Sequence, residues 1–414
     1  MTSGESPSIV LSYDHAAAVV GREAERVRPQ PGPARIAERV ALDAAAGRVL
    51  AEPVIADRDQ PPFARATRDG YACRAVDLPA GGLRVVGQLR AGDAWTLGAI
   101  RPGEAVEIMT GAAAPPGADC VVMLEHVAVH EQWISLAGAR EIAAGENIVA
   151  AGAEARSGAV VVSAGRRLGV TEIAAAAACG GAELAVFARP KVAILATGDE
   201  LVDVKERPQP HQIRNSNSHS LAAQVRAAGG EPEMLPIVRD DKAATERAIG
   251  DGARCDLVLL TGGVSMGKFD FVEQALAGLG AEFFFTGARM QPGRPVVFGR
   301  LATAHFLGLP GNPISTMVTF ALFAAPLVRA LGGENEHKPR FRLAQLEEEV
   351  RVKAGLTRFL PARVESHGRG ARVRRIEWQG SGDLAAAARA NGFLVVPETT
   401  ERLAAGEVAS VLEI

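Results

Sequence analysis

One hydrophobic pattern recurs three times in the middle of the chain: an apolar run that ends in a small, polar, glycine-rich loop. The runs 192–196, 257–260 and 306–309 lead into the loops 197–201, 261–267 and 310–313. Continuous apolar runs bounded by turn residues are typical of strands buried on both faces of a parallel sheet. Helical patterns lie between and after these runs, near 218–228, 241–250, 269–279 and 313–331. The alternation predicts right-handed crossovers and a doubly wound α/β sheet.

The three polar loops are predicted to converge on one edge of that sheet. In open parallel sheets, ligands bind outside the carboxyl ends of the strands. Backbone N–H groups from the glycine-rich loops and nearby carboxylates would therefore meet there. Such a mixture suits a phosphorylated substrate whose reaction is assisted by a metal ion.

The pattern changes on both sides of this unit. Residues from about 12 to 51 have helical spacing, interrupted by prolines at 29–33, and a second helical connector is predicted at 169–180. Short β-prone segments fill 57–155, and others occur near 373–378, 393–396 and 409–414. The predicted domains are a discontinuous helical linker domain (8–57 and 156–187), a β-rich module (58–155), the α/β domain (188–333) and a small C-terminal β-barrel-like domain (334–414).

Composition narrows the function classes. The chain has 414 residues, of which 48% are hydrophobic and 22% charged, and this is typical of a soluble protein with several domains. The formal net charge of −3 gives no overall field that favours nucleic acid or an anionic membrane as a partner.

The four cysteines are scattered and form no C-x-x-C pair, which argues against a zinc site or a disulfide framework. The first residues contain no signal-peptide pattern, and the alanine-rich run 174–178 is too short to cross a bilayer. These features predict a cytoplasmic protein.

The loop after the second apolar run allows two chemistries. Residues 263–267 match G-x-S-x-G, the nucleophile motif of α/β-hydrolases, with Ser265 as the nucleophile. A hydrolase also needs a later histidine at a strand end, but His305 falls inside an apolar run. The loop fits better as an anion cradle in front of a helix, in which backbone N–H groups bind a phosphate. A tight turn without a ligand remains the simpler alternative.

Carboxylates follow several of the predicted strands. Asp199, Glu200, Asp240 and Asp270 lie just beyond strand ends, and Asp241 is placed as the N-cap of the next helix. Each residue alone is more often a cap or a loop residue than a ligand. Together on one edge, they predict at least one Mg²⁺ held by carboxylates and substrate oxygens.

Two loops of the β-rich module are also candidates. Residues 68–72 contain Asp69, and 109–112 contain Thr110. From local chemistry alone, both are compatible with ordinary turns.

Set in order, these segments resemble the molybdopterin molybdenumtransferase family, which includes bacterial MoeA and the E domain of gephyrin. The resemblance covers nearly the whole chain, and its specificity lies in the order and spacing of the motifs. The matching segments are 69–72, 108–112, 197–201, 212–217, 239–241, 262–267 with Asp270, 292–295, 309–313, 379–382 and 390–393.

The resemblance implies an activity and an assembly. Members of this family insert molybdate into adenylylated molybdopterin with Mg²⁺ and release AMP. Their L-shaped, four-part subunit forms a homodimer, in which the β-rich module reaches the cleft of the partner subunit. The α/β unit is similar to the pterin-binding domain of molybdopterin adenylyltransferases. That enzyme and molybdoenzyme chaperones are therefore candidate protein partners, beside the pterin substrate.

The resemblance also assigns site residues. The family's functional positions correspond to Asp69, Thr110, Glu200, Asp240 and Asp270, and the metal ligands to Asp199, Glu200, Asp240 and Asp270. The predicted cofactor-binding residues are Thr197, Gly198, Gly262, Gly263, Ser265, Gln291, Arg294, Pro310, Gly311, Asn312, Pro313, Arg358 and Ser381.

Three departures from the family pattern keep other functions open. Gln291 stands where the family usually has lysine, Val149 where it often has arginine, and 66–68 read Ala-Thr-Arg instead of Ser-Ala-Met. The departures leave open a paralogue with altered metal preference and a non-catalytic scaffold that binds the molybdenum cofactor. The likeness of the α/β unit leaves open a molybdopterin adenylyltransferase. The extra β-rich module with Asp69 argues against the adenylyltransferase.

Overall fold

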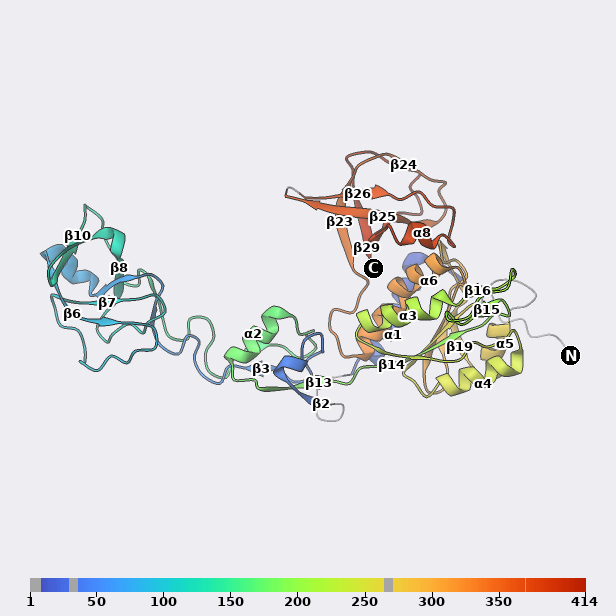
Figure 1. Cartoon of the computed structure of the whole chain (residues 1–414), viewed down its shortest axis with the longest axis horizontal. Helices are drawn as coiled ribbons and strands as arrows, with labels where there is room; N and C mark the ends of the chain where they lie inside the picture. Colours follow the sequence, from blue (N-terminus) through green and yellow to red (C-terminus); the bar gives the residue numbers. More distant parts are fainter. Residues whose placement is uncertain (1–8, 30–35, 264–270, 369) are drawn as a thin grey trace.

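The computed structural model describes residues 9–29, 36–263, 271–368 and 370–414. The subunit is elongated (Figure 1): a β-rich module lies at one end, and a narrow segment containing helix α2 joins it to an α/β unit. The C-terminal β unit lies beside the α/β unit, so the chain has the outline of an L.

The α/β unit is built on a six-stranded sheet in the order β17-β14-β18-β22-β21-β19. The first four strands are parallel, as predicted, and the last two add an antiparallel edge. The bounds are β14 Lys191–Ala196, β17 Glu231–Met234, β18 Leu257–Thr261, β19 Glu282–Phe285, β21 Val297–Arg300 and β22 His305–Leu309.

Burial on both faces explains the continuous apolar runs. Along β14, Val192 and Ile194 pack into one hydrophobic cluster, and Ala193 and Leu195 pack into another on the opposite face. A strand covered by helices on both sides has no solvent face, so its sequence does not alternate.

The predicted helices of this unit are confirmed. Their bounds are α3 Ser216–Ala227, α4 Lys242–Gly252, α5 Phe271–Gly278, α6 Pro313–Thr319 and α7 Ala325–Leu331, with a π-helical turn (η5, Phe320–Ala324) between the last two. The side chain of Asp241 accepts a hydrogen bond from the N–H of Ala244 at 2.7 Å, which confirms it as an N-cap. The segment 313–331 is long and apolar enough to span a membrane, but 78% of its most apolar window is buried inside the fold.

The helical prediction for the first fifty residues is half wrong. Helix α1 (Tyr13–Val27) forms after strand β1 (Val10–Ser12), but β2 (Ile36–Ala41) is a strand that pairs with β13 (Glu183–Phe187). The helical spacing near 36–42 was misleading because β2 finds its partner about 150 residues away, and long-range pairing overrides local preference. Helix α1 packs on the α/β core through Ala16, Val20 and Ala24, although its segment was expected in the linker.

The narrow connecting segment has a small core of its own. Helix α2 (Val170–Ala178) confirms the predicted connector, and strands β3 (Val54–Ile55) and β12 (Val160–Val162) pair next to it. Leu50, Leu168 and Val186 lie in the same hydrophobic cluster.

The β-rich module contains a six-stranded sheet in the order β8-β5-β7-β6-β10-β9, which confirms its predicted character. The bounds are β5 Gly70–Cys73, β6 Leu83–Leu89, β7 Glu104–Ile108, β8 Cys120–Met123, β9 Val127–His130 and β10 Trp133–Leu136, and β4 (Arg65–Ala66) pairs with β11 (Ile148–Val149). Separate apolar clusters cover this sheet's two faces, one around Val106 and one around Tyr71.

The C-terminal unit is a closed five-stranded barrel, which confirms the predicted β-barrel-like fold. Strand pairs run β25-β26-β23-β29-β27 and back to β25, so the ring has no open edge. The bounds are β23 Phe341–Leu346, β25 Thr357–His367, β26 Gly370–Arg375, β27 Gly392–Val396 and β29 Val408–Glu413, with β24 Val350–Arg351, β28 Arg402–Leu403 and helix α8 Leu384–Ala387 outside the ring. Strand β20 (Gly287–Gln291) pairs with β25 and thereby joins the barrel to the α/β unit.

Candidate functional site

The loops after β14, β18 and β22 lie side by side at one edge of the α/β sheet. The N–H of Thr197 donates to the carbonyl of Thr261 at 3.0 Å, and the N–H of Gly262 donates to the carbonyl of Leu309 at 3.4 Å. We call this edge the rim. It collects the first and third polar loops and residues 261–263 of the second, as the sequence pattern predicted; residues 264–267 lie outside the described residues.

Glycine is required at one point of the rim. Gly262 has φ +92°, and a Cβ there would lie 2.4 Å from the carbonyl oxygen of Thr197. A Cβ on Gly311 would lie 3.6 Å from the Cα of Gly262, so the second and third loops touch through their backbones. Exposed backbone at such close approach is the geometry that lets N–H groups reach an anion.

Three predicted carboxylates lie at the end of β14 and the loop after β17. A Cβ on Gly198 would lie 2.6 Å from a carboxylate oxygen of Glu200, so the side chain of Glu200 folds back over Gly198. The N–H of Asp240 donates to Oδ1 of Asp199 at 3.4 Å. Burial, followed by the negative charges of Asp199 and Glu200, raises the pKa of the Asp240 carboxyl.

The negative charge of these three carboxylates is the feature that would attract a metal ion. Within the described residues, no three His, Cys, Asp or Glu side chains are grouped closely enough to hold a metal. The predicted residues Ser265 and Asp270 lie outside the described residues. Magnesium often binds through one or two carboxylates and completes its shell with water and substrate phosphate. Because Asp199 and Asp240 are adjacent and their negative charges interact, the pair fits a cation of this kind.

The C-terminal barrel contributes to the same side of the α/β unit. Gln291 of β20 pairs with Arg358 of β25, so these two predicted residues are neighbours on adjacent strands. The carbonyl of Ser381 accepts a hydrogen bond from the N–H of Ile314, at the start of α6, at 2.9 Å. Ser381 therefore meets the loop that contains Pro310, Asn312 and Pro313. Arg294 is exposed in the turn between β20 and β21.

A cavity of about 640 Å³ lies next to the carboxylates. Its wall includes Gly198 and Asp199 together with Ser218, His219 and Arg239. The last three were not selected from the sequence. His219 follows the candidate segment 212–217 and Arg239 begins the candidate segment 239–241, but nothing in their local pattern separates them from ordinary surface residues.

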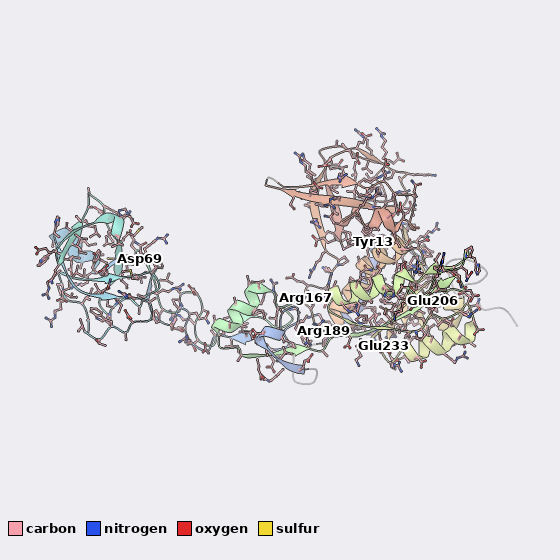
Figure 2. All side chains as sticks on the ribbon, viewed as in Figure 1. Tyr13, Asp69, Arg167, Arg189, Glu206 and Glu233 are labelled. Atoms are coloured by element: carbon pink, nitrogen blue, oxygen red, sulfur yellow. The ribbon has the colours of Figure 1, made fainter. Side chains whose placement is uncertain are left out.

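Asp69 and Thr110 form a second constellation. Both the N–H and the hydroxyl of Thr110 donate to Oδ1 of Asp69, each at 2.7 Å. These bonds, the backbone one first, hold the pKa of Asp69 below its usual range, so it stays ionised. Figure 2 places Asp69 at one end of the subunit and Glu206, which lines the cavity next to the carboxylates, at the other. One chain therefore does not bring Asp69 to its own rim.

Comparison with known families covers most of the chain. The model described as "MoeA N-terminal region (domain I and II)" matches residues 11–180, "Probable molybdopterin binding domain" matches 193–330, and "MoeA C-terminal region (domain IV)" matches 344–414.

Individual proteins are similar over the same length. A molybdopterin molybdenumtransferase of Nostoc sp. is 38% identical over 308 residues, which cover 72% of this chain and 70% of that protein. The Bacillus subtilis protein of the same name is 33% identical, with coverage of 91% and 90%. A crystal structure of a molybdopterin biosynthesis MoeA protein from Pyrococcus horikoshii superposes with a TM-score of 0.78 at 28% identity, covering 98% of this chain and all of the other.

Proposed function

This chain belongs to the molybdopterin molybdenumtransferase family, and we propose that it inserts molybdate into adenylylated molybdopterin and releases AMP. It is a transferase of molybdenum cofactor biosynthesis. The observation that supports this reaction is the rim. There, glycine-rich backbone loops lie beside the carboxylates Asp199 and Asp240, whose negative charges interact.

The rim suits the two anionic reactants. Backbone N–H groups around Gly262 and Gly311 can bind phosphate oxygens without the desolvation cost of a buried cation. Arg358 and Gln291 lie next to each other where the barrel meets the α/β unit, and they can contact molybdate or the pterin of the substrate. Positioning and charge stabilisation would supply most of the rate, with little need for a protein nucleophile.

Mg²⁺ would be held by Asp199 and Asp240, with Glu200 and Asp270 completing the acidic set. The ion would neutralise negative charge between the substrate phosphates, molybdate and these carboxylates. Asp240 would then stay ionised, because a cation beside it opposes the effect of its acidic neighbours on its pKa.

We propose that the complete site forms between two subunits. Asp69 and Thr110 are oriented by two hydrogen bonds but lie far from the rim of their own chain (Figure 2). In a symmetric dimer, the module of one subunit can reach the rim of the other, and the same contact then occurs twice. We infer that the reaction occurs in the cytoplasm, and the four free thiols support this location.

Incubation of the purified protein with adenylylated molybdopterin, Mg²⁺ and molybdate tests the proposal. We expect AMP release that depends on molybdate and Mg²⁺, with molybdenum retained in the pterin. Consumption of ATP with molybdopterin would assign the adenylyltransferase reaction instead. Binding of the pterin without turnover would assign a scaffold.

A further inference from the structure

Asn217, in the first turn of α3, joins two of the rim loops through its side chain. Its Nδ2 donates to Oγ1 of Thr261 at 2.9 Å and to the carbonyl of Gly311 at 2.7 Å. Thr261 is the last residue of β18, and Gly311 lies in the loop after β22. A side chain from a third element thus bridges the ends of two neighbouring strands.

The orientation of this amide is fixed by its partners. The carbonyl of Gly311 can only accept, so the Nδ2 edge must face it. Oδ1 of Asn217 is then buried and has no hydrogen-bond partner among the residues that the structure describes. A buried unpaired acceptor costs about 1–3 kcal/mol, so a residue that carries one calls for an explanation other than stability.

The pairing of β18 with β22 ends at Thr261 and Leu309, so beyond this point other contacts hold the two loops together. Gly262 and Gly311 meet through bare backbone, since neither has a side chain to fill the gap. The direct backbone bond between the second and third loops, from the N–H of Gly262 to the carbonyl of Leu309, is long at 3.4 Å. The two shorter bonds of Asn217 therefore help to hold the Gly311 loop against the end of β18.

We propose that Asn217 is a positioning residue, which holds the Gly262 and Gly311 loops at the distance that binds the phosphate of the substrate. This inference rests on the proposed function, because it takes these loops as the anion cradle. Asn217 makes no contact with Asp199, Glu200 or Asp240 in the hydrogen bonds that the described residues form, so it should act on the cradle and not on the metal.

The test compares two asparagines that make the same number of hydrogen bonds. Asn217→Ala should raise the KM for adenylylated molybdopterin about tenfold, the loss expected for two net hydrogen bonds, and change kcat less than about threefold. The Mg²⁺ concentration at half-maximal rate should not change. The control is Asn391→Ala in the barrel, whose amide bonds the carbonyl and the N–H of Val364 at 2.9 and 2.7 Å. It should leave the KM unchanged.

Two further variants remove the same hydrogen bonds with little change in side-chain shape, so they are less prone to misfold. Asn217→Asp keeps the shape but removes both donors and points an acceptor at the carbonyl of Gly311, so its KM should rise at least as far. Thr261→Val removes only one bond and should raise the KM less. The double variant Asn217→Ala with Thr261→Val should match Asn217→Ala alone, because both changes remove the same contact.

Calorimetric measurement of AMP binding separates failure of the proposed function from failure of the role proposed for Asn217. If the wild type releases no AMP from the substrate, the proposed function fails, but Asn217→Ala should still weaken AMP binding about tenfold relative to Asn391→Ala. The inference is overturned if folded Asn217→Ala and Asn217→Asp bind substrate and AMP as tightly as the control. It is also overturned if KM and the Mg²⁺ requirement rise together.

Discussion

At Asp240, burial and the neighbouring charges of Asp199 and Glu200 favour the protonated carboxyl. A carboxyl whose pKa is higher in the fold than in the unfolded chain opposes folding once it ionises. That cost is complete above the folded pKa and absent below the unfolded one. At neutral pH without a divalent cation, the ionised Asp240 therefore destabilises the rim.

Asp240→Asn should remove that cost. Without Mg²⁺ at pH 7, the variant should be as stable as the wild type or more stable by less than about 1 kcal/mol, because solvent screens a partly exposed charge. It should lose the stabilisation that Mg²⁺ gives the wild type, and AMP release should fall at least about 100-fold. Thermal melts with and without Mg²⁺ provide the measurement.

Asp241→Asn is the matched control for this variant. Asparagine caps a helix as well as aspartate does, so this neighbouring substitution should change neither the Mg²⁺ response nor the rate. A normal Mg²⁺ response in Asp240→Asn would remove Asp240 from the metal site.

Residue-level prediction from the sequence worked where a motif implies a geometry. Asp199, Glu200 and Asp240 were expected beyond strand ends and Asp241 at the start of a helix, and the structure has all four in these positions. Asn217 was part of a noted segment but received no role, since its two partners, Thr261 and Gly311, lie 44 and 94 residues away. No local pattern reveals such a contact.

At the scale of the elements, the conformation of the turn after β18 can be tested by adding a single methyl group. Gly262→Ala places a Cβ 2.4 Å from the carbonyl oxygen of Thr197, so the first and second loops must separate. We expect a loss of about 1–3 kcal/mol in unfolding free energy and a clear loss of substrate binding. Chemical denaturation and substrate titration measure the two effects.

The control Gly158→Ala separates the cost of a left-handed backbone conformation from the cost of a steric clash. Gly158 has a similar φ of +82°, but a Cβ there meets nothing within 4 Å. It should show only the cost of the left-handed conformation, about 1–2 kcal/mol, with normal binding. Equal binding in both variants would mean that the contact between the loops does not matter for the substrate.

Elements buried on both faces were the easiest to predict. The apolar runs at β14, β18 and β22 and the helices after them match the pattern, because local burial dictates local composition. Strand β2 was predicted as helix, since its pairing with β13 is invisible locally. The antiparallel edge formed by β21 and β19 was not foreseen, because its pairing depends on residues that are distant from one another in the sequence.

On the scale of the whole molecule, an ion cluster around the buried Glu334 links the narrow segment that contains α2, together with the β-rich module (the arm), to the α/β unit. Glu334 is only 3% exposed and pairs with Arg167 at 2.6 Å and Arg340 at 3.3 Å. Arg167 also donates to the carbonyls of Gly47 and Ala228, and it lies between the two units in Figure 2. Burial, then the charge of Arg340, lowers the pKa of the nearby Arg329, and Glu334 opposes this.

Glu334→Gln should therefore remove the negative charge that Arg167, Arg340 and the nearby Arg329 share. We expect a loss of about 3–5 kcal/mol and a more variable angle between arm and α/β unit, measured by denaturation and small-angle scattering. Glu336→Gln, which breaks the pair of an 80% exposed side chain with Arg166, should do neither. Equal behaviour of the two variants would show that the cluster does not fix the arm.

The overall shape was predicted only through resemblance to a family. Composition and periodicity indicated separate β-rich and α/β units, but no residue pattern gives the distance between them. The separation of Asp69 from the rim is a property of the linker's packing. It is also the feature that makes the proposed site depend on a second subunit.

We propose that molybdenum transfer occurs at a site built from the rim of one subunit and Asp69 of another. Asp69→Ala and Asp240→Ala proteins, each inactive alone, should be mixed under conditions in which mass spectrometry confirms subunit exchange. About half of the dimers become hybrids, each with one intact site and one site that carries both lesions. We expect AMP release to recover to roughly a quarter of the wild-type rate. Activity that stays at the level of the single variants, despite confirmed exchange, would contradict it.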